Sequence, residues 1–140
     1  MDVFEEIDYW INTLQEDLKC YETEEKKETV KNLFYAIANQ GLLNYFILKE
    51  RKGIIAYCIT PDYRGDLTLN ELFLYIKSEH RGSFKLFKEL INHIEKKAKE
   101  NKCKTVRIGA NLNYKDEKIL RALNTLGYKA DVVVKQIGDK

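Results

Sequence analysis

Residues 69–101 carry the pattern that most constrains how this chain can fold. Leu69–Ile76 is an apolar run with the length and composition of a buried β-strand. A short loop with an Arg81–Gly82 pair follows, and residues 83–99 then repeat apolar side chains at helical spacing: Phe84, Phe87, Leu90, Ile91, Ile94 and Ala98. The first amides of a helix have no acceptor within it, and their partial positive charge suits a phosphate. The succession of strand, loop and helix therefore predicts an anion-binding loop, although a plain turn with a surface arginine is the alternative.

Two amphipathic helices are predicted at the N-terminus. Residues 3–20 place apolar side chains at three- and four-residue spacing: Val3, Phe4, Ile7, Trp10, Ile11, Leu14 and Leu18. Thr23 is suited to cap a second helix, which ends at Gly41 because glycine commonly follows the last helical turn. The apolar side chains of this second helix are Val30, Leu33, Phe34 and Ile37.

The apolar spacing changes to two from Leu43 onward, which predicts β-strands. Residues 43–49 and 53–60 flank the turn Arg51-Lys52-Gly53 and are expected to form a hairpin. A second turn at residues 61–66 leads into the strand at 69–76. These strands should be antiparallel because their connections are too short for a crossover.

The chain is expected to return to the same sheet after the helix at 83–99. Residues 104–110 read as a strand that is reached through a helical crossover, so it should lie parallel to the strand at 69–76. A last helix at about 115–126 ends at Gly127, and residues 131–137 read as a closing strand. We therefore expect one domain covering residues 1–140, with a mixed sheet and four helices.

Charge and composition narrow the classes of protein to which this chain can belong. Its 140 residues include 24 basic and 22 acidic side chains, a net charge of +2 that argues against a dedicated nucleic-acid binder. Cys20, Cys58 and Cys103 are odd in number and widely spaced, which predicts reduced thiols and neither a disulfide framework nor a metal site. No apolar stretch approaches the roughly 20 residues of a membrane span, and the N-terminus is acidic where a signal peptide is basic. A cytoplasmic protein is expected.

Three segments in this order resemble the GCN5-related N-acetyltransferase (GNAT) family over nearly the whole chain. They are Leu74-Tyr-Ile76 with His80-Arg81-Gly82, the helix that runs to Asn101, and the C-terminal helix that ends in Leu126-Gly127-Tyr128. The chain looks closest to short, divergent members encoded by bacteriophages, which share the Arg-Gly-Ser loop and a lysine such as Lys135 in the last strand. The resemblance implies an α/β fold: a single GNAT-like domain whose mixed, mostly antiparallel sheet has a central splayed parallel strand pair and about four helices.

The resemblance also implies that acetyl-CoA binds as a cosubstrate. In the family, the pantetheine arm pairs with the exposed edge of the strand before the loop, which implies main-chain contacts from Tyr75 and Ile76. The same comparison implies that the loop residues wrap the pyrophosphate: Arg81, Gly82, Ser83, Phe84 and Lys85. Asn111 and Asn113 occupy positions that often contact the pantetheine arm, although both are equally suited to cap a helix.

The loop departs from the family at two positions. Glycine or alanine is usual two and four residues after the Gly82 position, and this chain has Phe84 and Leu86 there. Both lie on the apolar face of the predicted helix, so their side chains can turn inward while their amides face the phosphates. His93, on the same helix, falls on the polar face and is expected to be exposed.

Acetyl transfer requires a neutral amine and hence a base. Family members often place a glutamate in this strand, which implies that Glu71 is the base; a solvent-facing glutamate on a half-exposed strand is the alternative. The tyrosine that commonly protonates the departing thiolate is replaced by Leu123. Tyr114 or Tyr75 could substitute for it, or could serve only in packing or substrate contact.

The expected activity is transfer of an acetyl group from acetyl-CoA to a primary amine. The acceptor stays open among a small amine, a protein lysine or N-terminus, and a modified nucleobase, and it would enter between the N-terminal helices and the strand ends. The alternative is a catalytically inactive binding module of the same fold that engages a protein or nucleic-acid partner. Dimers are frequent in the family, so a homodimer is also open.

Overall fold

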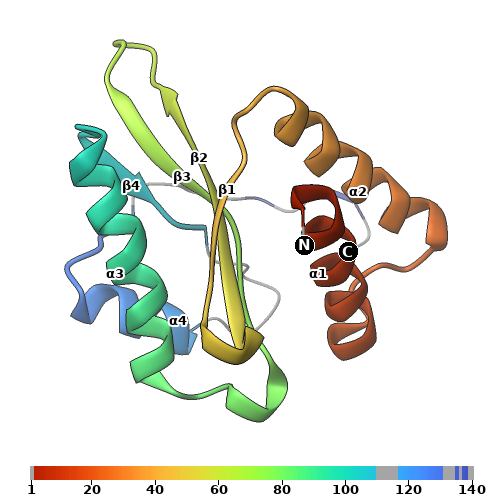
Figure 1. Cartoon of the computed structure of the whole chain (residues 1–140). Helices are drawn as coiled ribbons and strands as arrows, with labels where there is room; N and C mark the ends of the chain where they lie inside the picture. The colour runs from red at the N-terminus through yellow and green to blue at the C-terminus, as the bar shows by residue number, and fades with distance from the viewer. Residues whose placement is uncertain (1, 110–116, 131–134, 136, 139–140) are drawn as a thin grey trace. The chain divides into compact units, whose positions relative to one another are not determined.

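The computed structural model of the chain describes residues 2–109, 117–130, 135, 137 and 138. The chain divides into two compact units, Met1–Gly109 and Ala110–Lys140. The first unit contains the sheet and three of the described helices, coloured from red to teal in Figure 1. It therefore contains every described element that the sequence places around the candidate loop.

The three helices of the first unit begin where the sequence supplies capping residues. They are α1 (Val3–Leu18), α2 (Glu24–Asn39) and α3 (Phe84–Glu100). Asp2, Thr23 and Ser83 each precede a helix, and each side chain accepts a hydrogen bond from a main-chain N–H of the first turn. α1 and α2 lie together on one side of the sheet, and α3 lies on the other (Figure 1). The prediction of these helices is confirmed.

The sheet has the order β1-β2-β3-β4 and combines both kinds of strand pairing. Its strands are β1 (Asn44–Ile47), β2 (Gly53–Pro61), β3 (Leu67–Ile76) and β4 (Thr105–Arg107). β1 with β2 and β2 with β3 are antiparallel, whereas β4 is parallel to β3 after the crossover through α3. This mixed, mostly antiparallel sheet with one parallel pair confirms the expected fold class.

β3 leaves the regular ladder at a bulge and then parts from β4. Ala56 of β2 pairs with Phe73, but Tyr57 pairs with Glu71, so Leu72 is the extra residue. On the other side, the pairing of β3 with β4 covers only Thr68–Asn70 against Thr105–Arg107. Within the described chain, the part of β3 that follows Asn70 is thus paired through its main chain with β2 only, as expected of a splayed pair.

The turn between β1 and β2 differs in detail from the one expected. The predicted turn at Arg51-Lys52-Gly53 is instead a 3-10 turn over Lys49–Arg51, in which Glu50 and Arg51 adopt positive φ. Arg51 is held there by an ion pair with Glu6 of α1. Gly53 is needed for a different reason, since a Cβ at this position would lie 2.6 Å from the Tyr75 carbonyl oxygen.

The sheet is buried on both faces. On the side of α1, Trp10 packs with Ile54 and Tyr75 in one apolar cluster. On the side of α3, the helix contacts β2, β3 and β4, and its inward residues Leu90, Ile91 and Ile94 are fully buried. Burial of each such side chain contributes about 1.5–3 kcal/mol relative to exposure. β3 is therefore held rigidly between two layers of helices.

His93 of α3 is not exposed, contrary to the expectation from its polar neighbours. Its ring stacks on Phe46 with the centroids 4.1 Å apart, and Nε2 lies 3.4 Å from the Tyr57 hydroxyl. Burial lowers the pKa of His93. The helical pattern alone could not reveal this, because the partners come from β1 and β2.

The second unit contains α4 (Glu117–Thr125), which confirms the expected C-terminal helix. Gly127 follows it with φ +94°, a left-handed conformation that glycine adopts without strain. The strand predicted at residues 131–137 falls largely outside the described residues. In the described part of the chain, no helix has both the length and the apolar character needed to cross a bilayer.

Candidate active site

Glu71 lies in β3 at the point where the parallel ladder ends. The last β3–β4 pair joins Asn70 to Arg107, and Glu71 is the next residue along β3. Its Oε1 accepts a hydrogen bond from the Gly109 main-chain N–H at 3.0 Å. The carboxylate therefore bridges the two strands where they begin to part.

The environment of Glu71 changes the acidity of its carboxyl group. The side chain is half-buried, and this burial raises the pKa of Glu71 from 4.5 to about 7. The Gly109 N–H opposes the rise, because it stabilises the ionised form. A carboxyl group with a pKa near neutrality can both take up and release a proton at physiological pH, which general acid–base chemistry requires.

The main-chain groups of β3 alternate between the two edges of the strand. The Lys77 N–H donates to the Lys52 carbonyl at 2.9 Å. This bond shows which residues of β3 direct their main-chain groups toward β2, because such residues alternate along an antiparallel strand. The main chain of Tyr75 therefore faces β2 and is not free for the ligand contact expected from the sequence, whereas the main-chain groups of Leu74 and Ile76 face the opposite edge. Since pairing with β4 has already ended there, this edge can offer hydrogen bonds to an extended ligand.

The loop between β3 and α3 holds its shape through one glycine and one cap. Gly82 has φ +94°, and the space where a Cβ would lie is open. The Ser83 hydroxyl accepts a hydrogen bond from Leu86 N–H at 3.3 Å. Among the hydrogen bonds of the described residues, none uses the N–H groups of Phe84 and Lys85. These two N–H groups are donors that suit an anion such as a pyrophosphate.

A broad, open depression lies beside this helix start and is mainly basic. Its lining includes four lysine or arginine side chains and two acidic ones: Lys49, Lys52, Arg81, Lys85, Glu79 and Glu89. His80 and the capping Ser83 also line it. The excess of cations adds to the partial positive charge of the helix terminus, so the surroundings of the loop favour an anionic ligand.

The side chain of Phe84 does not turn into the core, although its position on the apolar face of α3 would have allowed it. Its side chain is 44% exposed, and its ring stacks on that of Phe87 with the centroids 6.4 Å apart. Leu86 is half-buried and lines the basic depression. Phe84 and Leu86, which replace the small residues usual in the family, therefore both reach the surface near the loop.

Arg81 is engaged by groups of the protein itself. Its guanidinium donates two hydrogen bonds to the Ile76 carbonyl, at 3.1 and 3.3 Å, and forms an ion pair with Asp17 of α1. The Tyr75 hydroxyl donates to the same Asp17 carboxylate. The hydrogen bond from Tyr75 lowers the pKa of Asp17, and Arg81 lowers it further. Arg81, Ile76 and Tyr75 are thus brought together, although through side chains and an aspartate that the sequence did not single out.

Three predicted site residues lie outside the described residues: Asn111, Asn113 and Tyr114. Among the described residues, no group of three or more histidine, cysteine or acidic side chains gathers in a way that could hold a metal ion.

Comparisons with known proteins support the architecture but not a sequence relationship. No protein-family model matches the sequence, and no curated protein is significantly similar to it. Solved structures do match. A proposed acetyl transferase from Pyrococcus furiosus has a TM-score of 0.75 at 21% identity, covering 96% of this chain and 95% of that one. A predicted acetyltransferase from Clostridium acetobutylicum, solved with acetyl-CoA, has a TM-score of 0.72 at 13% identity, covering 98% and 92%.

The chain has the GNAT fold. A transcriptional regulator from Bacillus halodurans C-125 is equally similar, with a TM-score of 0.74 at 19% identity over 96% of this chain and 94% of that one. At such identities the likeness is one of fold. The chemistry must therefore be argued from the residues of this chain.

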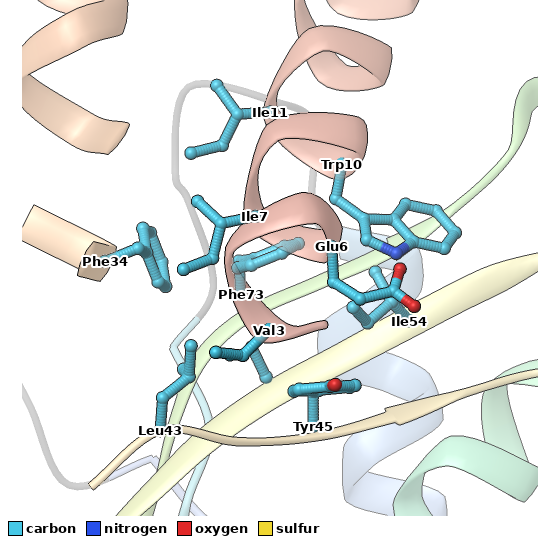
Figure 2. Close-up of a pocket in the computed structure, with 11 residues that line it drawn as sticks. Val3, Glu6, Ile7, Trp10, Ile11, Phe34, Leu43, Tyr45, Ile54 and Phe73 are labelled. Atoms are coloured by element: carbon cyan, nitrogen blue, oxygen red, sulfur yellow. The ribbon is translucent and has the colours of Figure 1, made fainter. Parts of the chain in front are cut away.

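A small apolar pocket lies between the N-terminal helices and the sheet of this GNAT fold. Figure 2 shows side chains from α1, together with Phe34 of α2 and Phe73 of β3, gathered around it. Glu6 is the charged residue of the lining, and its carboxylate is paired with Arg51. Trp10 also lines the pocket, and its Nε1 makes no hydrogen bond with the described residues. The walls of the pocket are thus almost entirely apolar.

Sequence reasoning located the loop and Glu71 but missed Asp17 and Gly109. Gly109 follows the predicted strand at 104–110, so the expected parting of the two strands could have drawn attention to it. Asp17 gave no such signal, because it is one polar residue among many on α1, 64 positions away from Arg81.

Proposed function

We propose that residues 1–140 form one acetyltransferase domain, which moves an acetyl group from acetyl-CoA to a primary amine. The observation that carries this proposal is Glu71, whose carboxyl has a pKa of about 7 at the site where β3 and β4 part. The fold supports it, since proteins described as acetyltransferases share it and one of them was solved with acetyl-CoA.

The described residues fit acetyl-CoA along one path. The main chain of Leu74 and the N–H of Ile76 would pair with the pantetheine arm, while the Ile76 carbonyl is taken by Arg81. The free amides at the start of α3 would receive the pyrophosphate. The loop residues proposed to surround the pyrophosphate are Arg81, Gly82, Ser83, Phe84 and Lys85. Asn111 and Asn113 are proposed to contact the pantetheine arm. When bound, acetyl-CoA supplies an acyl group activated as a thioester.

Glu71 is proposed to act as the general base. In its ionised form it takes a proton from the ammonium group of the acceptor, directly or through one water, and the neutral amine can then attack the acyl carbon. The C–N bond forms and the C–S bond breaks. The attacking nitrogen gives up its second proton to water, and the thiolate leaves with a proton from Tyr114 or from water. Tyr75 is less suited to this last role, because its hydroxyl donates to Asp17 and burial raises its pKa.

The acceptor is proposed to enter from the side of α1 and α2. The small apolar pocket of Figure 2 also lies on this side, but with a volume of about 20 Å³ it is too small to hold more than about one water. The origin in a bacteriophage, the cytoplasmic location and a homodimer stay predictions.

Gly82→Trp tests the cofactor loop. The indole would stand over the free amides of α3, so acetyl-CoA should bind at least tenfold more weakly in isothermal titration. Gly65→Trp is the matched control, because Gly65 also has a positive φ (+84°) and open space around it, so the backbone strain is similar. Equal affinity in the two variants would remove the loop from the binding site.

A binding module without catalysis is the second candidate, and two observations favour it. Phe84 exposes a large ring beside the loop, and a transcriptional regulator shares the fold. This candidate predicts no turnover of acetyl-CoA with any amine. Binding of acetyl-CoA without turnover in a screen of amines would favour an inactive module that has kept the cofactor site.

A further inference from the structure

Two contacts fasten both ends of the loop at residues 77–83 to α1. At its start, Lys77 Nζ donates to the Tyr9 hydroxyl at 2.6 Å. At its other end, Arg81 forms the ion pair with Asp17. α1 and α3 lie on opposite sides of the sheet, so these contacts connect a helix of one layer to the start of a helix in the other (Figure 1).

Asp17 is the centre of the second contact. Its carboxylate accepts hydrogen bonds from both the Tyr75 hydroxyl and the Arg81 guanidinium. The Asp17 side chain is 20% exposed, whereas that of Arg81 is 46% exposed. The carboxylate is therefore the more buried partner of a charge-assisted hydrogen bond.

The position of Arg81 has two consequences for the loop. Its guanidinium covers the Ile76 carbonyl, the last acceptor at the open edge of β3. It also fixes the residue directly before Gly82, whose positive φ turns the chain toward α3. Since glycine has the widest conformational freedom of any residue, a fixed neighbour limits how far this turn can vary.

We propose that Asp17 is a positioning residue for acetyl-CoA: by holding Arg81 on the Ile76 carbonyl, it keeps the loop in the form that presents the Phe84 and Lys85 amides. In this proposal, the main contribution of Arg81 to the pyrophosphate site is made through this contact. The inference rests on the proposed function, because acetyl-CoA is the ligand to be positioned.

The substitution Asp17→Asn tests the proposal. Asparagine keeps the shape of the side chain and an acceptor for Tyr75, but it removes the charge that holds Arg81. Because this pair is partly exposed, we expect the dissociation constant of acetyl-CoA to rise about fivefold. Hydrogen exchange at the first turn of α3 should also become faster in the free protein.

Two control variants accompany this test. Glu16→Gln removes a neighbouring, exposed charge from the same helix and should leave the affinity and the exchange of α3 unchanged. Asp17→Glu restores the charge on a longer side chain and should recover part of the lost affinity.

The outcomes separate the possible roles of Arg81 and Asp17. Tighter binding of acetyl-CoA by Asp17→Asn would overturn the proposal, because it would mean that Asp17 competes with the phosphates for Arg81. Unchanged affinity, with faster exchange confined to α1, would reduce Asp17 to a packing role and also overturn it. If the wild-type protein binds no acetyl-CoA, the proposed function fails. Exchange at α3 would then still decide whether Asp17 holds the loop.

Discussion

At the scale of single residues, Glu71 shows how position changes chemistry. A glutamate on an exposed strand edge would be ionised at pH 7 and would have little affinity for a proton. Partial burial beside the end of β4 brings the pKa of Glu71 to about 7, while one main-chain N–H from Gly109 orients the carboxylate. This combination favours the base and disfavours the solvent-facing alternative.

If Glu71 is the general base, kcat/KM should depend on pH. Because the carboxyl of Glu71 must be ionised to accept a proton, kcat/KM should rise with pH and level off above an apparent pKa of about 7. Glu71→Gln should lower kcat by about 100-fold near pH 7 and remove this ionisation from the profile. Initial rates of thiol release between pH 5 and 9 would check both statements. If the pH profile of kcat/KM is unchanged in Glu71→Gln, Glu71 is not the base and only faces solvent.

The same substitution has an effect on stability whose sign follows from linkage. The folded protein binds the Glu71 proton more tightly than the unfolded chain does, since its pKa is raised from 4.5 to about 7. The stabilisation is therefore complete below about pH 4.5 and is lost as pH rises through about 7. Relative to Glu71→Gln, the wild-type protein should lose about 3 kcal/mol of unfolding free energy between pH 4.5 and 8, measured by urea denaturation.

At the scale of elements, the start of α3 combines a structural cap with the proposed binding of a pyrophosphate. Ser83 satisfies the Leu86 amide, which leaves the Phe84 and Lys85 amides for a ligand. Thr23 caps α2 in the same way, through the Lys26 amide at 3.1 Å, but far from the loop. Substitutions at the two caps can thus distinguish an effect on stability from an effect on ligand binding.

Loss of either cap should cost about 1 kcal/mol of unfolding free energy. Ser83→Ala should in addition weaken acetyl-CoA binding several-fold, because the freed first turn of α3 no longer holds its amides in place. Thr23→Ala should leave the affinity unchanged. Calorimetric titration of both variants provides the check, and equal affinities would show that the cap serves the fold alone.

The sequence could predict these elements because their determinants are local. Apolar spacing, the caps Thr23 and Ser83, and the glycines at 41 and 82 located the helices and the loop within a few residues. The bulge at Leu72 and the exposure of Phe84 depend on neighbouring strands and helices, which no local pattern contains. Asp17 is the clearest case, because its role exists only once α1 meets the end of β3.

At the scale of the molecule, the sheet explains why the candidate site lies where it does. β3 is held on one side by β2 along its length, and on the other by β4 over three residue pairs only. Glu71, the open edge and the loop then follow one another along a single strand. The proposed base, the open strand edge and the proposed anion site are therefore arranged in the order in which a thioester cosubstrate would need them.

Thermal denaturation with and without saturating acetyl-CoA, with ATP as the anion control, tests this account most directly. A ligand present at 100 times its dissociation constant stabilises the folded state by about 2.7 kcal/mol, which raises the Tm of a domain of this size by several degrees. The account predicts this rise with acetyl-CoA and a much smaller one with ATP. No rise, or an equal rise with both ligands, would contradict it.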